Sequence, residues 1–137
     1  MERFTVTKAL DFSYGHRLVR YTGKCRHLHG HNGLLEVVLE TDRLDERGMA
    51  IDFSEIKDTL GKWVREHLDH RMILCREDPL VPLLEKIGEP LYVMEDNPTA
   101  ENIAKEVWNK AADQGLPVRE TRLWETSTSL ASYRGSR

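Results

Sequence analysis

The sequence has few cysteines, no block of positive charge and no long apolar run. Its 137 residues include only two cysteines, Cys25 and Cys75, which are too few for the disulfide framework of a small secreted domain. We therefore expect both to be free thiols. A free cysteine beside histidines, as Cys25 is, is more often catalytic or metal-bound than bridged.

Charge and hydropathy argue against two further classes of protein. The formal net charge is −3, and no lysine- or arginine-rich segment indicates a nucleic-acid-binding surface. Charged residues interrupt the apolar runs, so none is long enough to span a membrane. Residues 1–8 lack the apolar stretch of a signal peptide. We expect a cytoplasmic protein that binds neither nucleic acid nor membrane.

The length of the chain predicts one domain over residues 1–137. Hydrophobic residues make up 39% of the sequence, which is enough for a modest core. A domain of this size leaves much of its surface exposed, so we expect assembly with copies of itself. The sequence contains no internal repeat, low-complexity tract or linker.

Alternating apolar residues predict four strands. The first two cover residues 3–13 and 34–41 and flank a histidine-rich connection, which favours a hairpin-like pair with a long loop. Two more follow at 117–127 and 129–135. The apolar positions that define the first pair are Phe4, Val6, Leu10 and Phe12, then Leu35, Val37 and Leu39.

Two helices are expected between these strand pairs. The first begins near Ser54 as N-cap and closes at residues 68–70, and the second is capped by Thr99 and stopped by Gly115. Residues 75–97 appear irregular, with a short helix near Leu83 and an extended piece over 91–94. The order predicts an α+β fold, ββααββ: a four-stranded antiparallel sheet with two helices on one face.

The segment "CRHLHGH" at residues 25–31 is the strongest candidate site. On an extended segment His29 and His31 point the same way, which makes a zinc half-site. His16, just past the end of the first strand, is the natural third ligand, although His27 has the same parity. The alternative is a polar loop that binds no metal.

Cys25 has more than one possible role. It could complete a four-ligand structural zinc site, or act as a nucleophile or base, because thiols near cationic groups ionise more readily. The spacing does not distinguish these roles.

Two carboxylates are further candidates. Asp69 could orient His70 as a proton relay, or His70 could simply favour a helix C-terminus. Glu125, beside Trp124, could bind two adjacent N–H donors of a heterocycle, or face solvent from a strand.

Six segments together resemble the 6-pyruvoyl-tetrahydropterin synthase family, in the same order from Phe4 to Gly135. The Cys-x-x-x-His-Gly-His spacing is similar to that of its bacterial 6-carboxy-5,6,7,8-tetrahydropterin synthase branch, which serves queuosine biosynthesis. The segments are "FSYGHRL", "CRHLHGHN", "MAIDFSEIK", "LDH", "NPTAENIA" and "WETSTSLASYRG".

The resemblance implies a role for each candidate residue. It implies a catalytic cysteine with a relay pair, a three-histidine Zn²⁺ site and a glutamate that anchors a pterin, with two weaker pterin contacts. Cys25 matches the catalytic cysteine, and Asp69 and His70 match the relay pair. The zinc ligands are His16, His29 and His31. Glu125 matches the pterin anchor, and Glu101 and Thr99 match the weaker contacts.

The resemblance also implies a fold, an assembly and a reaction. The fold is the tunnelling fold, assembled as a homohexamer of two trimers with active sites between subunits. The reaction converts 7,8-dihydroneopterin triphosphate into 6-carboxytetrahydropterin, acetaldehyde and triphosphate. Alternatives are another pterin side-chain lyase, such as 6-pyruvoyl-tetrahydropterin synthase, or a non-catalytic zinc-stabilised pterin-binding protein.

The sequence departs from the family pattern at three places. Gly33 stands where relatives usually carry an aromatic residue, "SYGH" at residues 13–16 replaces the commoner "AAH" or "ASH", and residues 75–97 are longer than in compact bacterial members. These departures bear on which pterin is preferred.

Overall fold

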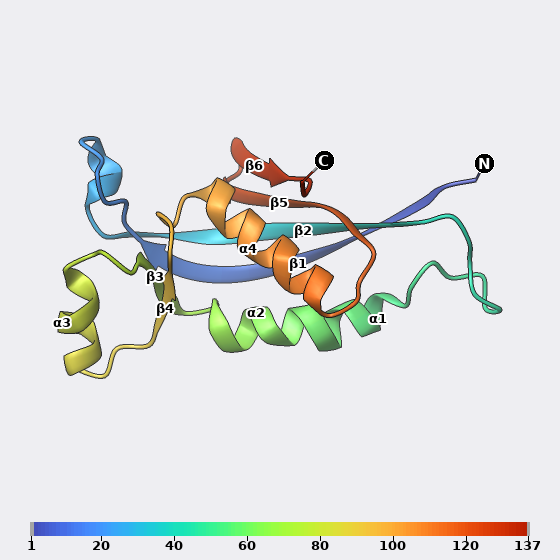
Figure 1. The fold of residues 1–137 in the computed structure, drawn as a ribbon, viewed down its shortest axis with the longest axis horizontal. Coiled ribbons are helices and arrows are strands. Elements are labelled where there is room, and N and C mark those ends of the chain that lie inside the picture. Colours follow the sequence, from blue (N-terminus) through green and yellow to red (C-terminus); the bar gives the residue numbers. More distant parts are fainter. Residues whose placement is uncertain (1, 137) are drawn as a thin grey trace.

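One six-stranded sheet organises the chain, and the computed structural model describes residues 2–136 (Figure 1). The strand order is β4-β3-β1-β2-β5-β6. Strands β1, β2, β5 and β6 pair antiparallel, whereas β3 runs parallel to both β1 and β4. The bounds are β1 (Phe4–His16), β2 (His29–Thr41), β3 (Arg71–Cys75), β4 (Leu91–Met94), β5 (Val118–Thr126) and β6 (Ser129–Tyr133).

The predicted four-stranded antiparallel sheet is therefore wrong in two respects, because there are six strands and the sheet is mixed. The sequence prediction missed β3. Its residues Ile73, Leu74 and Cys75 are consecutive and all fully buried. A strand buried on both faces has no alternation of apolar and polar residues, so period-two patterning does not reveal it. The extended piece predicted over 91–94 is β4.

The first predicted helix is present, with a different start. Segments α1 (Phe53–Ile56), η2 (Lys57–Gly61) and α2 (Lys62–His67) follow one another without interruption, and η2 is a π-helical turn. The N-cap is Asp52 rather than Ser54, because the Asp52 carboxylate accepts a hydrogen bond from the Ser54 amide at 2.9 Å.

The remaining helices match their sequence signals. The short helix predicted near Leu83 is α3 (Leu80–Lys86). The last helix, α4 (Ala100–Asp113), is capped as expected by Thr99, whose hydroxyl accepts from the Asn102 amide at 3.1 Å. A 3₁₀ turn, η1 (Lys24–Arg26), lies in the connection between β1 and β2.

Both long helices cover the same face of the sheet, as predicted (Figure 1). Their apolar stripes join one core with alternate residues of β1, β2 and β5, and burial of each such leucine or isoleucine contributes about 1.5–3 kcal/mol. The helix residues in this core are Ile56, Leu60, Val64 and Leu68, then Ile103, Ala104, Val107 and Ala111.

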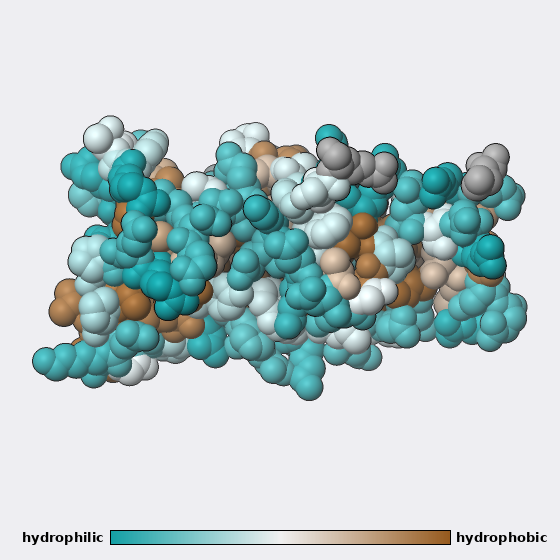
Figure 2. Space-filling model, in the orientation of Figure 1, coloured by the Kyte–Doolittle hydropathy of each residue, from teal (hydrophilic) through white to brown (hydrophobic). Residues whose placement is uncertain are grey.

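Hydrophilic side chains cover most of the face shown in Figure 2. An apolar patch lies at the end where Figure 1 places α3, and Leu83 and Ile87 there are exposed. Within residues 2–136, no helix has the length and apolar character needed to span a membrane.

Candidate metal and pterin site

Strand register brings three histidines together. Both β1 and β2 extend further than predicted, so that His16 ends β1 and His29 begins β2. The two residues are cross-strand partners, and His31 is the partner of Tyr14 two pairs further along. One ring nitrogen from each of His16, His29 and His31 lies within 4.8 Å of the others. The predicted ligand set is thus assembled by the backbone of a single hairpin.

Backbone carbonyls fix the orientation of two of the imidazoles. The Nδ1 of His16 lies 2.7 Å from the carbonyl oxygen of Pro98, and the Nδ1 of His29 lies 2.7 Å from that of His27. A carbonyl can only accept, so each Nδ1 carries the proton and donates. The Nε2 atoms are left as acceptors, which is the state of a metal-binding imidazole.

The buried Nε2 of His16 fits a metal ligand. It has no hydrogen-bond partner among the described residues, and a buried polar atom in that state is costly. Burial, the largest effect, lowers the pKa of His16 and so keeps the ring neutral. Three imidazole nitrogens this close together match the donor set of a catalytic zinc site, which takes three protein ligands. Zn²⁺ therefore suits these residues.

Glu125 of β5 lies against the histidine cluster. Its Oε2 is 3.6 Å from Nε2 of His16 and 3.7 Å from Nε2 of His31. The neighbouring Trp124 donates its indole N–H to Glu36 at 2.8 Å. The Glu125 side chain remains partly exposed, so one carboxylate is close to the histidine nitrogens and also accessible from solvent.

Tyr14 is a site residue that sequence reasoning missed. It is 3% exposed, and its hydroxyl donates to Oε2 of Glu125 at 3.3 Å. Burial first, and then the Glu125 charge, raise the pKa of this phenol, so it stays protonated as a donor. The available signal was its parity, because Tyr14 shares a strand face with His16.

Gly33 and Tyr14, two departures from the family pattern, are packed together. A Cβ atom on Gly33 would lie 3.0 Å from Cε1 of Tyr14. A side chain at position 33 would therefore require the ring of Tyr14 to move by a few tenths of an ångström. The absence of a side chain at Gly33 makes room for the ring of Tyr14.

Asp69 and His70 form a pair where α2 gives way to β3. The Asp69 carboxylate lies 3.0 Å from Nδ1 of His70 and accepts the Ser13 amide at 2.8 Å. The His70 amide donates to the Ser13 carbonyl at 2.6 Å, and His70 has φ +60°. Few non-glycine residues adopt that conformation, and here β1 holds it in place.

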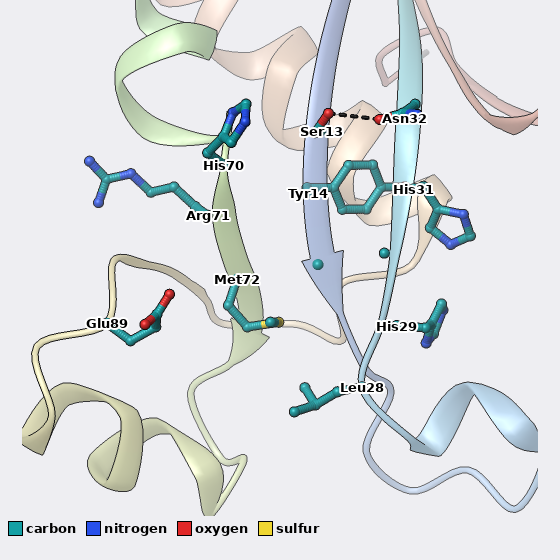
Figure 3. Close-up of a pocket in the computed structure, with 12 residues that line it drawn as sticks. Ser13, Tyr14, Leu28, His29, His31, Asn32, His70, Arg71, Met72 and Glu89 are labelled. Atoms are coloured by element: carbon teal, nitrogen blue, oxygen red, sulfur yellow. Dashed lines mark hydrogen bonds between the residues drawn. The ribbon is translucent and has the colours of Figure 1, made fainter.

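His70 of this pair and two residues of the histidine cluster line one cleft. His70 is 81% exposed and lines a cleft of about 520 Å³, and His29 and His31 line the same cleft. Figure 3 shows the His70 ring on the β1 side, whereas the rings of His29 and His31 lie beyond β2. One cleft therefore connects His70 with His29 and His31 of the same chain.

The other predicted site residues lie outside these two groups. Cys25 is half-buried in η1, and the metal-ligating cluster found among residues 2–136 does not include it. Glu101 is exposed in the first turn of α4. Thr99 uses its hydroxyl as a cap, although it directly follows Pro98, whose carbonyl holds His16.

Comparisons with known proteins agree on one family. Residues 5–136 match the family model described as 6-pyruvoyl tetrahydropterin synthase. A Rickettsia conorii protein named 6-carboxy-5,6,7,8-tetrahydropterin synthase is 37% identical over 127 residues, which cover 88% of this chain and 92% of that protein.

Solved structures share the fold. An uncharacterized protein from Wolinella succinogenes is similar with a TM-score of 0.81 and 27% identity, covering 99% of this chain and 100% of the other. The 6-pyruvoyl tetrahydropterin synthase of Caenorhabditis elegans has a TM-score of 0.73 and 24% identity, covering 99% of this chain and 98% of that one. The second likeness concerns the fold alone.

Proposed function

The chain belongs to the 6-pyruvoyl tetrahydropterin synthase family, and from this premise we propose that it is a zinc-dependent 6-carboxytetrahydropterin synthase. It would convert 7,8-dihydroneopterin triphosphate into 6-carboxy-5,6,7,8-tetrahydropterin, acetaldehyde and triphosphate, a step of queuosine biosynthesis. The observation that carries the proposal is the buried, unpartnered Nε2 of His16 within a three-histidine cluster that faces Glu125.

In this proposal His16, His29 and His31 hold Zn²⁺ through their Nε2 atoms. Zinc bound there supplies Lewis-acid polarisation of the oxygens on the substrate side chain, which acidifies the adjacent C–H bond. The carbonyls of Pro98 and His27 keep two of the rings in the ligating tautomer.

Glu125 anchors the pterin. Its ionised carboxylate accepts two hydrogen bonds, and the 2-amino group and adjacent ring N–H of a pterin present two donors side by side. The distances of 3.6 Å and 3.7 Å to the histidine nitrogens place this carboxylate in the same site as the proposed metal ligands. Thr99 and Glu101 contribute weaker contacts to the pterin.

Cys25 and His70 carry out the proton transfers in this proposal. Cys25 removes the proton from the acidified carbon, and His70, oriented by Asp69, exchanges protons on the opposite side of the substrate. The His70 side chain is 81% exposed, so it is accessible to a neighbouring subunit, which supports a site shared between subunits. We infer a homohexamer of two trimers with shared active sites.

Product analysis tests the reaction. Zinc-loaded protein is mixed with 7,8-dihydroneopterin triphosphate and the products are identified by mass, with Cys25→Ala in parallel. Carboxytetrahydropterin and acetaldehyde, both lost in the variant, would support the proposal. A different pterin product would move the chain to a sister activity, and pterin binding without turnover would indicate a binding protein.

Subunit complementation tests the shared site. His31→Ala and His70→Ala should each be inactive alone, because each lacks one half of every site. Mixed after dissociation and reassembly, the two variants should regain activity, since some interfaces then pair an intact histidine cluster with an intact relay. If mixing restores no activity although mixed oligomers form, the site lies within one chain.

A further inference from the structure

We propose that Tyr14 is a positioning residue for pterin recognition: its hydroxyl holds the Oε2 atom of Glu125 at the histidine cluster and leaves the rest of the carboxylate to the pterin. The inference rests on the proposed function of Glu125 as the pterin anchor. It adds a residue from β1 to a site otherwise built from histidines and one glutamate.

The ring of Tyr14 has a fixed place between the core and the histidines. It stacks on Phe12 with centroids 5.0 Å apart and meets His16 edge-on at 5.2 Å. Its centroid lies 5.5 Å from that of His31, and Gly33 leaves room beside Cε1. A ring packed on these sides cannot swing away, so its hydroxyl is a fixed donor.

The contacts of Glu125 converge on a single oxygen. Within the part of the chain that the structure describes, Tyr14, His16 and His31 all approach Oε2, at 3.3, 3.6 and 3.7 Å. Of the three, only the Tyr14 hydroxyl makes a hydrogen bond to this oxygen, and at 3.3 Å the bond is long. The hydroxyl therefore fixes the direction of this carboxylate in a way that the two imidazoles do not.

A neutral donor suits this task. A flexible glutamate next to a divalent cation can rotate and take the open coordination position, because carboxylates ligate zinc well. An arginine or lysine would restrain it but would also neutralise the charge that binds the pterin N–H groups. The phenol restrains Oε2 and leaves the negative charge of Glu125 in place.

The test removes the hydroxyl and keeps the ring, with Tyr14→Phe. The control is Tyr92→Phe, because the Tyr92 hydroxyl makes the same kind of hydrogen bond to a glutamate, Glu106, away from the histidine cluster. The probe is 7,8-dihydroneopterin, and its Kd for each zinc-loaded protein is measured by fluorescence. Zinc affinity and Tm are measured on the same samples.

Tyr14→Phe should weaken pterin binding about five- to tenfold, the effect of losing one hydrogen bond to a charged group at long distance. It should bind zinc at least as tightly as the parent, because Glu125 is released toward the metal. Tyr92→Phe should leave both affinities unchanged. In a Glu125→Gln background, Tyr14→Phe should weaken pterin binding by less than twofold, since the two residues act together.

Two results would overturn the inference while the proposed function stands: equal pterin affinity in Tyr14→Phe and Tyr92→Phe, or parallel loss of zinc affinity and Tm in Tyr14→Phe. The first would mean that the hydroxyl does not direct Glu125, and the second that Tyr14 only supports the fold. If the parent protein itself does not bind the pterin, the proposed function fails and this inference fails with it.

Discussion

Replacing His29 by alanine should remove most of the stabilisation that zinc confers, without unfolding the protein. His29 is one of three nitrogens within 4.8 Å of one another, and its side chain is only half-buried, so alanine leaves no large cavity. His67→Ala is the matched control, because His67 is an exposed histidine of α2 that bonds only the Trp63 carbonyl.

The expected magnitude follows from linkage. Zinc at about one hundred times its Kd stabilises the folded state by about 2.7 kcal/mol. For a domain of this length, about 3 °C per kcal/mol gives a rise in Tm of about 8 °C. If loss of one ligand weakens binding about a hundredfold, the same zinc concentration is then near Kd and the rise falls to about 1 °C.

The assay is thermal unfolding of metal-free protein with and without added zinc. The parent and His67→Ala should show the full rise in Tm, and His29→Ala should show almost none while its metal-free Tm stays within about 2 °C of the parent. An equal zinc-induced rise in His29→Ala and the parent would refute the reasoning, because it would place the stabilising metal elsewhere.

Three further predictions follow from individual contacts. Burial lowers the pKa of His16 below its ordinary value of 6.5, so below that pH the unfolded chain binds more protons than the folded chain. The metal-free protein should therefore lose stability as the pH falls below about 6.5, and a pH series of Tm values checks this. Gly33→Ala places a methyl group 3.0 Å from Tyr14, so urea denaturation should show a loss of about 1–3 kcal/mol; an unchanged midpoint would mean that the ring yields freely. The Arg17 guanidinium makes two hydrogen bonds, of 2.5 and 2.8 Å, to the fully buried carboxylate of Asp78. Arg17→Ala removes both, so the free energy of unfolding, measured by the same assay, should fall by about 3 kcal/mol. A fall of less than about 0.5 kcal/mol would show that the pair does not stabilise the fold.

The histidine cluster could be predicted because it depends on local rules. Parity along an extended segment aligns His29 with His31, and the first strand carries His16 to the same end of the hairpin. The structure adds that all three belong to the strands themselves. The conformations of two rings depend on the carbonyls of His27 and Pro98, and Pro98 lies 82 residues from His16, beyond the reach of local patterning.

The contacts of Tyr14 and the strand β3 could not be predicted for a related reason. Tyrosine is an ordinary residue in a strand, and its link to Glu125 spans 111 residues and depends on the registers of β1, β2 and β5. β3 is buried on both faces and has no alternating pattern. Cap choice was also ambiguous, because Asp52 and Ser54 are both good N-caps.

The position of His70 is also a property of the whole sheet. Sequence spacing places the Asp69–His70 pair at the end of a helix, and the structure has it there. The parallel pairing of β3 with β1 places His70 at the cleft that His29 and His31 also line. That pairing belongs to the strand the sequence pattern did not reveal.

The most direct test of the central claim is a zinc titration of turnover. Metal-free protein receives increasing zinc, and formation of carboxytetrahydropterin from 7,8-dihydroneopterin triphosphate is measured at each step. We expect activity to rise linearly and saturate at one zinc per chain, and His29→Ala to show almost none over the same range of zinc. Full activity in metal-free protein, or in His29→Ala, would contradict this claim.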